Sequence, residues 1–296
     1  MKKIGIPLMI LASAFAMVLP TGSAQAQATR TWVSGVGDDV NPCSRTAPCK
    51  TFPGAISKTA SGGEINCIDP GGFGTVTITK SITIDCGGTF GSILAAGTTG
   101  VNVSSTAGIK VVLRNISING AGNGINGVSI NIGSTVLLEN VQIFGFTNNG
   151  INTGSLTQSA TIEARNVSFE YINGTGAQFQ TSGGFAVGQI TGSSFLGVTN
   201  GVTAGTNGFV SVSNSSFIGS TTAAQASGNG TLNVDTSLFT NNTNAVTAGV
   251  GTNVRVSNNA LYDNPNGFTI NGTMISDGKN RVVGATASPP TTLPLK

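Results

Sequence analysis

The chain has 296 residues, a formal net charge of +3 at pH 7 and only 8% charged residues, whereas soluble domains usually carry about a quarter. Two lysines within the first three residues supply 2 of these charges, so the rest of the chain has a net charge of +1, which excludes a strongly basic nucleic-acid-binding protein. Gly, Asn, Ser and Thr are abundant, but regularly spaced Val, Ile, Leu and Phe supply a core and argue against disorder.

Residues 1–26 are predicted to be a secretory signal peptide. A basic start precedes a mostly apolar run from Ile4 to Leu19, and Ala24-Gln25-Ala26 supplies small residues for cleavage. A membrane anchor is the alternative, but the apolar run is shorter than the roughly 20 residues that a spanning helix needs. We therefore expect a secreted or periplasmic protein with no membrane span.

All four cysteines, Cys43, Cys49, Cys67 and Cys86, lie early in the chain, and export to an oxidising compartment favours disulfides. Three pairings are available in principle. A Cys43–Cys49 bond would close a small loop, and a Cys67–Cys86 bond would join neighbouring coils of a solenoid, which are spaced by about 4.8 Å. A metal site is the weaker alternative, because the sequence has no histidine and no Cys-x-x-Cys pair.

Residues 27–62 are predicted to form an N-terminal cap region. Within it, the segment Thr51–Ala60 is expected to form a short helix over the first coil, because an open stack of strands exposes unpaired backbone edges. The first strands of the coils are then expected at residues 64–68, 76–78 and 82–86.

An internal repeat is the main signal for the fold. A short strand motif ends in an apolar residue at positions 118, 143, 169, 195, 217, 239 and 261, in steps of 25, 26, 26, 22, 22 and 22 residues. The leucine framework of leucine-rich repeats is absent, and helical repeats need a 3.6-residue period, whereas the local period here is two. Each repeat therefore predicts one coil of a parallel β-helix, with about nine or ten coils over residues 63–285. A later Gly or Ala followed by an apolar residue also recurs, as in Gly124-Ile125, Gly150-Ile151, Gly201-Val202, Ala245-Val246 and Gly267-Phe268.

Identical positions of stacked coils lie above one another, so like residues are predicted to form ladders. Phenylalanines would form an interior stack, and asparagines would form a ladder at a turn, where their amides can bond to one another and to the backbone. Gly192 and Thr236 interrupt the asparagine series, so local irregularity is expected there. The predicted ladders are Phe169, Phe195, Phe217 and Phe239, and Asn115, Asn140, Asn166, Asn214 and Asn258.

The last strands are expected at Met274-Ile275 and Val282-Val283, followed by a flexible Pro- and Thr-rich tail over residues 286–296.

Four segments near the start are familiar: Trp32–Asp39, Pro48–Phe52, Gly62–Ile65 and Asp69–Gly74. They resemble the opening of bacterial right-handed β-helix proteins of the pectin-lyase-like superfamily, and with the repeats the resemblance covers roughly residues 30–285. It implies the fold but no single activity, because the superfamily includes polysaccharide lyases, glycoside hydrolases, epimerases and adhesins.

Alternate residues of a strand face outward, so the aligned repeats predict two outer columns on one face. One column begins Val112, Leu137, Glu163 and continues to Arg255, and the other runs through Arg114, Glu139 and Arg165.

Arg114, Glu139, Glu163 and Arg165 form the only dense charge cluster of the repeats. They are the candidate catalytic residues of a lyase acting on an acidic, uronate glycan, a reaction that needs a base and a cation to neutralise the sugar carboxylate. The alternative is an alternating-sign ladder that only lowers repulsion between coils. Calcium enters only under the lyase hypothesis, and Glu139 between two arginines is a poor ligand for it.

Hydrolase chemistry needs two carboxylates a few ångströms apart, and the repeats contain few carboxylates. Asp38, Asp39, Asp69 and Asp85 are interpreted as turn or cap residues. The absence of histidine from the sequence excludes catalytic triads and departs from the epimerase pattern of the superfamily.

The short repeats leave little sequence for the long loops that wall a catalytic cleft. We therefore expect a non-catalytic secreted solenoid that presents a polar face to an extracellular glycan, an envelope component or a partner protein, with no cofactor, metal or nucleic acid. The lyase-like enzyme is the alternative, and a lattice-binding surface is a third hypothesis that the mixed outer columns do not favour. The sequence says nothing of oligomeric state.

Overall fold

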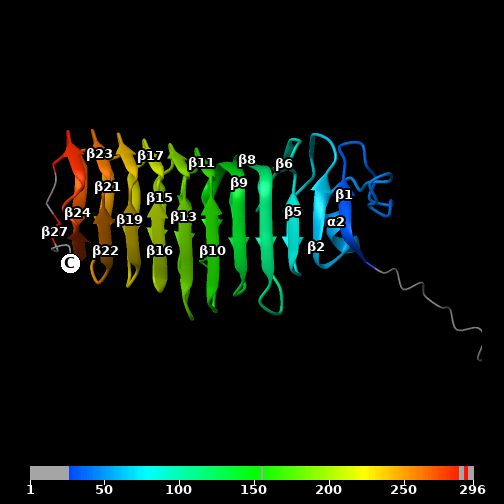
Figure 1. The fold of residues 1–296 in the computed structure, drawn as a ribbon, viewed down its shortest axis with the longest axis horizontal. Helices are drawn as coiled ribbons and strands as arrows, with labels where there is room; N and C mark the ends of the chain where they lie inside the picture. The colour runs from blue at the N-terminus through cyan, green and yellow to red at the C-terminus, as the bar shows by residue number, and fades with distance from the viewer. Residues whose placement is uncertain (1–26, 155, 287–289, 293–296) are drawn as a thin grey trace, which may run out of the picture.

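The computed structural model describes residues 27–154, 156–286 and 290–292, which form one elongated parallel β-helix of about ten coils (Figure 1). The described strands pair in parallel with the strands of neighbouring coils, and the coils follow one another in chain order along the long axis. The predicted all-β solenoid is confirmed.

Each coil contributes to three parallel sheets, here named face A, face B and face C. Face A contains β1 (Ala28–Val33), β2 (Thr59–Cys67), β5 (Ile82–Asp85), β10 (Ala160–Arg165), β13 (Ala186–Thr191), β16 (Gly208–Ser213), β19 (Thr231–Asp235), β22 (Asn253–Ser257), β25 (Thr273–Ser276) and β27 (Thr291–Thr292). Face B contains β3 (Gly71–Gly72), β6 (Gly91–Leu94), β11 (Ser168–Glu170), β14 (Ser194–Leu196), β17 (Ser216–Ile218), β20 (Leu238–Thr240), β23 (Ala260–Tyr262) and β26 (Arg281–Val283). Face C contains β4 (Val76–Ile78), β7 (Val101–Val103), β12 (Thr175–Phe179), β15 (Asn200–Ala204), β18 (Thr222–Ala226), β21 (Asn244–Ala248) and β24 (Asn266–Ile270).

Two long strands, β8 (Lys110–Ile130) and β9 (Thr135–Asn152), each run through all three faces. Their pairing shifts register between Asn119 and Asn126, and it places Ile151 beside Val128. The sequence alignment of Gly124-Ile125 with Gly150-Ile151 was therefore wrong. A two-residue Gly-apolar motif is too short to reveal a register shift at a corner, and Ile125 is exposed instead of paired in the core.

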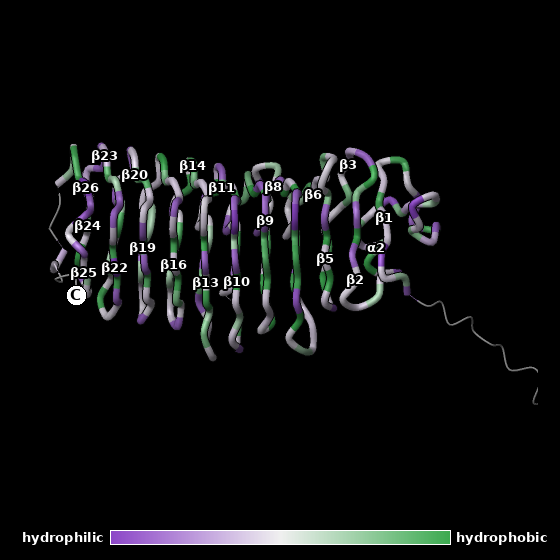
Figure 2. Tube along the Cα trace, viewed as in Figure 1, coloured by the Kyte–Doolittle hydropathy of each residue, from purple (hydrophilic) through white to green (hydrophobic). Residues whose placement is uncertain are grey.

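The apolar interior is organised as files of equivalent residues. Phe169, Phe195, Phe217 and Phe239 lie on successive coils with ring centroids 4.5–4.8 Å apart and interplanar angles of 1–7°. All four rings are buried, and burial of each ring stabilises the fold by about 1.5–3 kcal/mol. Figure 2 shows hydrophobic segments recurring at matching places on successive coils.

The corner between faces A and B explains the asparagine ladder. Asn115, Asn140 and Asn166 have φ of 56°, 55° and 52°, a left-handed conformation that asparagine tolerates better than most residues. Their amides also bond along the helix axis: Asn140 Nδ2 donates to Asn115 Oδ1 (3.2 Å) and Asn166 Nδ2 to Asn140 Oδ1 (2.7 Å).

The irregularity expected at Gly192 and Thr236 is wrong. These residues adopt the same left-handed conformation, with φ of 61° and 46°, and the register of the flanking strands continues without a shift. Conformation at this corner is set by the geometry of the coil, and glycine satisfies it at no steric cost. Thr236 still joins the ladder, because Asn258 Nδ2 donates to its hydroxyl at 3.3 Å.

A second, buried ladder lies one residue further along the chain. The hydroxyls of Ser193, Ser215 and Ser237 each accept a hydrogen bond from the backbone N–H of the equivalent residue on the preceding coil, at 3.1–3.2 Å. Asn259 and Asn280 continue the series at 2.9 and 3.0 Å. These side chains satisfy backbone donors at a buried bend, where an unpaired N–H would be costly. The sequence analysis missed this ladder.

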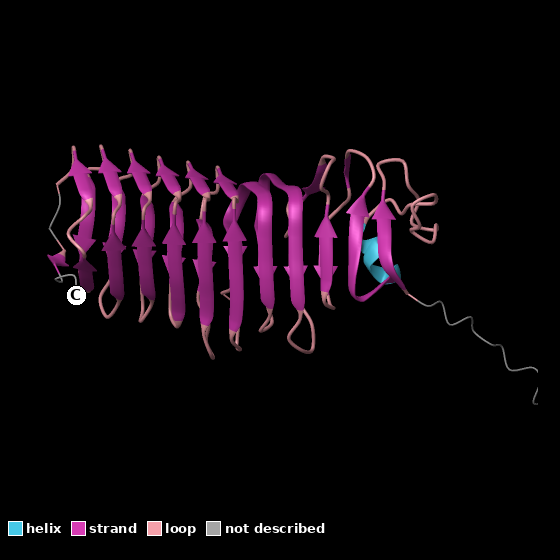
Figure 3. Ribbon diagram, viewed as in Figure 1, coloured by secondary structure: helices cyan, strands magenta, loops and turns pink. Residues whose placement is uncertain are grey.

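The helix α2 (Phe52–Lys58) covers the N-terminal end of the helix interior (Figure 3). Thr51 caps it by accepting a hydrogen bond from the Gly54 N–H at 3.0 Å, and Pro53 lies in its first turn. Phe52 and Ile56 pack into the core, so this helix closes the first coil as predicted.

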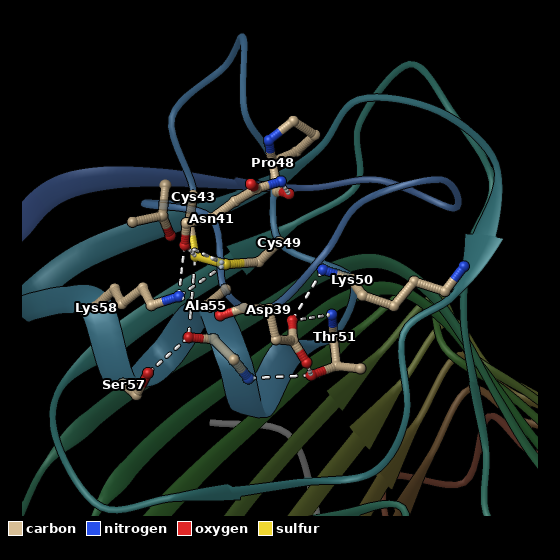
Figure 4. Close-up of a disulfide and its surroundings, with 12 residues drawn as sticks. Asp39, Asn41, Cys43, Pro48, Cys49, Lys50, Thr51, Ala55, Ser57 and Lys58 are labelled. Carbon is tan, nitrogen blue, oxygen red and sulfur yellow. Dashed lines mark hydrogen bonds between the residues drawn. A yellow bond between two sulfur atoms is a disulfide. The ribbon is translucent and has the colours of Figure 1, made fainter.

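Two disulfides, Cys43–Cys49 and Cys67–Cys86, lie at this end, each with a Cα–Cα distance of 4.7 Å. Figure 4 shows Asp39 and Lys58 around the first of them. Asp39 accepts hydrogen bonds from the Lys50 N–H, the Thr51 N–H and the Thr51 hydroxyl at 2.7–2.9 Å. Burial raises the pKa of Asp39, but these hydrogen bonds and the nearby Lys58 outweigh burial and hold its pKa below the ordinary 3.8.

Parallel pairing begins at β1 and reaches β27, so it extends beyond residues 63–285 at both ends. The signal peptide predicted over residues 1–26 lies outside the described residues, as do 287–289 and 293–296 of the predicted tail. Strands β25 and β26 include the expected final strands.

Candidate functional site

The four predicted catalytic residues lie together on face A. Strand pairing places Arg114, Glu139 and Arg165 in one column on consecutive coils, with Asp85 one coil earlier, and Glu163 lies in the adjacent column. Arg114 Nε bonds Glu139 Oε2 at 2.7 Å, and Arg165 Nε bonds Glu163 Oε1 at 2.5 Å. All four side chains are partly exposed.

The four aspartates near the N-terminus hold turns. Asp69 accepts hydrogen bonds from the Ser34 hydroxyl (2.5 Å) and the Gly35 N–H (2.6 Å), and Asp38 accepts one from the Val40 N–H (3.0 Å). Asp85 accepts from the Gly87 N–H at 2.8 Å and from Asn115 Nδ2 at 2.7 Å, which anchors the first rung of the asparagine ladder. Their carboxylates therefore serve local structure, as does that of Asp39.

Face C carries a column of outward residues that the sequence analysis did not identify. On successive coils this column contains only hydroxyl and amide side chains, and we name it the face C column. A signal was present, because each member directly follows the inward apolar residue of the β-strand. The column is Thr77, Asn102, Ser129, Asn152, Gln178, Thr203, Gln225, Thr247 and Thr269.

Side chains of this face bond to one another across coils. Asn149 Nδ2 donates to Gln178 Oε1 at 3.1 Å, and Gln225 Nε2 donates to the Thr203 hydroxyl at 3.0 Å. Asn131 Nδ2 likewise donates to Asn102 Oδ1 at 2.5 Å. Each amide has further donor or acceptor capacity beyond these bonds. Ser129 and Thr203 of the column are themselves buried.

Helix α2 lies at the N-terminal end of face C, and a groove of about 530 Å³ runs between them. Pro53 and Ile56 supply an apolar side to this groove, and Thr77, Asn102 and Asn131 supply polar groups. A second groove, of about 630 Å³, follows the corner between faces A and B and is lined by Asn166, Asn214, Asn258 and neighbouring serines.

No protein-family model matches the chain, and no curated protein matches it. Among solved structures, pectate lyase Pel9A has a TM-score of 0.63 at 14% identity, with 88% of this chain and 78% of that chain covered. The GH136 lacto-N-biosidase from Eubacterium ramulus has a TM-score of 0.54 at 11% identity, with 89% of this chain and 67% of that chain covered. The chain has a parallel β-helix fold similar to that of pectate lyase Pel9A. At these identities the likeness extends to the fold alone.

In this parallel β-helix, the charge cluster on face A is internally paired. Both arginines direct Nε to a carboxylate, which leaves the two terminal amino groups of each guanidinium as further donors. Exposed pairs of this kind contribute about 0–1 kcal/mol each. The geometry is that of an alternating-sign ladder, Asp85, Arg114, Glu139 and Arg165, across consecutive coils.

Among the described residues of the β-helix, no group of three or more His, Cys, Asp or Glu side chains is placed to hold a metal ion. In the same part of the chain, no helix has the length and apolar character needed to cross a membrane.

Proposed function

We propose that the protein is a non-catalytic extracellular β-helix that binds an uncharged glycan along face C. The observation that carries this proposal is the face C column, whose hydroxyl and amide side chains recur from Thr77 to Thr269 without a charged residue. Hydroxyls and amides both donate and accept hydrogen bonds, which matches the hydroxyl groups of a neutral sugar. The spacing of about 4.8 Å between coils repeats these contacts along a polymer.

The groove beside α2 supports the same ligand class. A pyranose ring presents an apolar C–H face and a rim of hydroxyls, and this groove combines apolar Pro53 and Ile56 with polar Thr77 and Asn102. Binding sites of this type pair an apolar surface with a few oriented polar groups. We propose that the groove receives one end of the bound glycan. This glycan is either a free polymer or a component of the cell envelope.

The two disulfides support an exported location. Cys43–Cys49 and Cys67–Cys86 are typical of a protein that folds in an oxidising compartment. Together with the predicted signal peptide, they support secretion to the periplasm or the medium, where glycans are accessible.

A lyase acting on an acidic glycan is the second candidate, and the fold that the chain shares with pectate lyase Pel9A favours it. Its residues would be Arg114, Glu139, Glu163 and Arg165, and only this candidate would use calcium as a cofactor. The existing ion pairs weigh against it. Arg114 is bonded to Glu139 and Arg165 to Glu163, and these bonds must break before either arginine can act as the base or bind the sugar carboxylate.

The test is binding of the mature protein to neutral glucan, mannan and galactan in parallel with polygalacturonate and alginate, measured by affinity electrophoresis and calorimetry. Neutral polymers should bind. Gln178→Ala and Gln225→Ala should each weaken binding about 3- to 10-fold, since each removes one hydrogen bond to the ligand of about 0.5–1.5 kcal/mol.

Gln189→Ala is the matched control, because Gln189 is an exposed glutamine on face A. This variant should bind as the parent does. Release of an unsaturated, ultraviolet-absorbing sugar from a uronate polymer, abolished by Arg114→Ala or Arg165→Ala, would refute the proposal and establish the lyase.

A further inference from the structure

Two exposed phenylalanines lie together at the corner where the chain passes from face C to face A. Phe185 is 53% exposed and Phe209 is 41% exposed, and their ring centroids are 5.3 Å apart with an interplanar angle of 80°. Exposed large apolar side chains that gather beside a groove indicate a binding site. We name this pair the aromatic platform.

A groove of about 320 Å³ lies beside the aromatic platform, on the coils that precede it. Phe185 lines the groove at its C-terminal end, and Phe209 packs against Phe185 from the following coil. One outward position of face A runs along the groove on four successive coils, which span about 14 Å at about 4.8 Å per coil. These residues are Lys110, Thr135, Thr161 and Val187.

The chain before Phe185 fixes the position of this ring. Gly183 and Gly184 pass close to the preceding coil, because a Cβ at Gly183 would lie 2.6 Å from the Thr157 carbonyl oxygen and one at Gly184 would lie 2.5 Å from Ser159 Oγ. Ser159 Oγ then accepts a hydrogen bond from the Phe185 N–H at 3.1 Å. The backbone of Phe185 is thus held beside the groove, which lowers the entropic cost of binding a ligand against its ring.

Ser134 is a second, independent indication of a ligand. It lines the same groove and is 6% exposed, and its Oγ has no hydrogen-bond partner among the described residues. Ile109 and Ala160 occupy the equivalent inward position on the neighbouring coils, so the fold does not require a hydroxyl there. A buried hydroxyl without a partner is costly and therefore rare. The serine hydroxyl turns about a single side-chain bond, so a ligand oxygen in the groove can supply the missing partner.

The groups that line the groove fit the ring of an uncharged sugar. A pyranose has a C–H face that stacks on the electron-rich face of an aromatic ring, and its hydroxyls bond to side-chain hydroxyls. Thr161 and Thr135 supply exposed hydroxyls on the two coils that precede Phe185. Glu163 follows Thr161 on the same outward side of β10, and its carboxylate disfavours a sugar acid at this end of the groove. Lys110, at the other end, can donate to a sugar hydroxyl.

We propose that this groove is a second glycan site, at which an uncharged sugar ring stacks on Phe185, and that the protein thereby joins two glycan chains. The ligand class rests on the proposed function, but the site itself is separate from the face C column. A chain bound along face C leaves the aromatic platform open to a second chain. Two sites on one molecule link dissolved polymers into a network.

The experiment measures binding of glucan, mannan and galactan oligosaccharides by calorimetry, in a background that carries Gln178→Ala and Gln225→Ala to weaken face C. In this background, Phe185→Ala should weaken the remaining binding about 5- to 10-fold, as expected for the loss of one aromatic stacking contact. Thr161→Val, which removes a hydroxyl and keeps the β-branched shape, should weaken it about threefold or more.

Two matched controls separate the site from general surface effects. Phe90→Ala removes a ring that is 58% exposed but precedes β6 on face B. Thr273→Val changes an exposed threonine at the same outward position of face A, beyond the aromatic platform. Both variants should bind as the background does, and circular dichroism verifies the folding of all four.

Turbidity of the dissolved neutral polymers tests the joining of chains. The parent should raise turbidity, and an excess of oligosaccharide should reverse it, whereas Phe185→Ala and the double glutamine variant should each raise it much less. Binding that Phe185→Ala leaves unchanged while Gln178→Ala weakens it overturns this inference and keeps the proposed function; the opposite pattern refutes binding on face C and keeps the aromatic site. A loss in Phe90→Ala equal to that in Phe185→Ala, a preference of the site for polygalacturonate, or binding at both sites without turbidity also overturns the inference.

Discussion

The internal file of phenylalanines predicts a graded loss of stability that depends on the number of stacked neighbours. Phe217 stacks on Phe195 at 4.5 Å and on Phe239 at 4.8 Å, whereas Phe169 stacks only on Phe195, because its other neighbour in the register is Ile143. Leucine fits this position, since Leu261 occupies it on a later coil. Substitution by leucine therefore removes aromatic contacts without leaving a large cavity.

Each stacked pair contributes about 0.5–1.5 kcal/mol beyond the burial of its area. Phe217→Leu loses two such contacts and should lower the free energy of unfolding by about 1–3 kcal/mol, whereas Phe169→Leu loses one. The difference between the two variants should therefore be about 0.5–1.5 kcal/mol. Phe217→Ala also creates a cavity and should cost about 3–5 kcal/mol.

The assay is equilibrium unfolding in guanidinium, followed by circular dichroism, with slopes compared to verify that the transitions remain alike. Hydrogen exchange would show whether the loss is confined to neighbouring coils, as expected for a quasi-one-dimensional stack. Equal destabilisation by Phe217→Leu and Phe169→Leu would refute the stacking argument. A cost below about 1 kcal/mol for Phe217→Ala would show that the ring is not buried.

Three further predictions concern the corners and the N-terminal end. Asn140→Val should destabilise the protein by about 1–3 kcal/mol in thermal or denaturant unfolding, because a β-branched residue is strained at φ 55°, whereas Asn140→Gly should cost less; equal costs would contradict this reason. Replacing both Cys67 and Cys86 by serine removes the bond that closes a loop with a sequence separation of 19. This should lower the free energy of unfolding by about 2–4 kcal/mol and increase amide hydrogen exchange in the first coils. Unchanged unfolding would contradict a structural role for this disulfide. The pKa of Asp39 is lowered in the folded state, so its ionised carboxylate stabilises the fold above the ordinary pKa of 3.8, and this contribution is lost as the pH falls through the lower folded-state pKa. Asp39→Asn should therefore flatten the pH dependence of the melting temperature in that acidic range. An unchanged slope would contradict this role of Asp39.

Much of the architecture could be predicted because the chain repeats the same two-residue alternation on every coil. The outer columns assigned from sequence, from Val112 to Arg255 and from Arg114 onward, are the columns that the strand register forms. Position within the repeat determines position in space here, so that alignment and structure agree wherever the spacing is regular. The sequence alignment likewise predicted that Arg114 and Glu139 lie side by side on neighbouring coils.

Features at the corners could not be predicted in this way. Alternation ends where the backbone becomes left-handed, so the inward direction of Ser193 and Ser215 depends on a corner conformation that the pattern does not encode. The face C column was missed for a related reason. Its inward positions include small residues such as Ala177 and Ala224, which give a weak apolar period, and the polar face C column beside them therefore received no weight.

The evenly spaced corners have a consequence for how such a molecule changes over generations. Between Gly192 and Asn258 the left-handed positions recur every 22 residues, and each cycle ends in the conformation with which it began. A gene segment encoding one cycle can be copied or deleted in tandem without disturbing the winding on either side, because neighbours meet the same contacts as before. The length of the β-helix can therefore change between generations by one coil at a time.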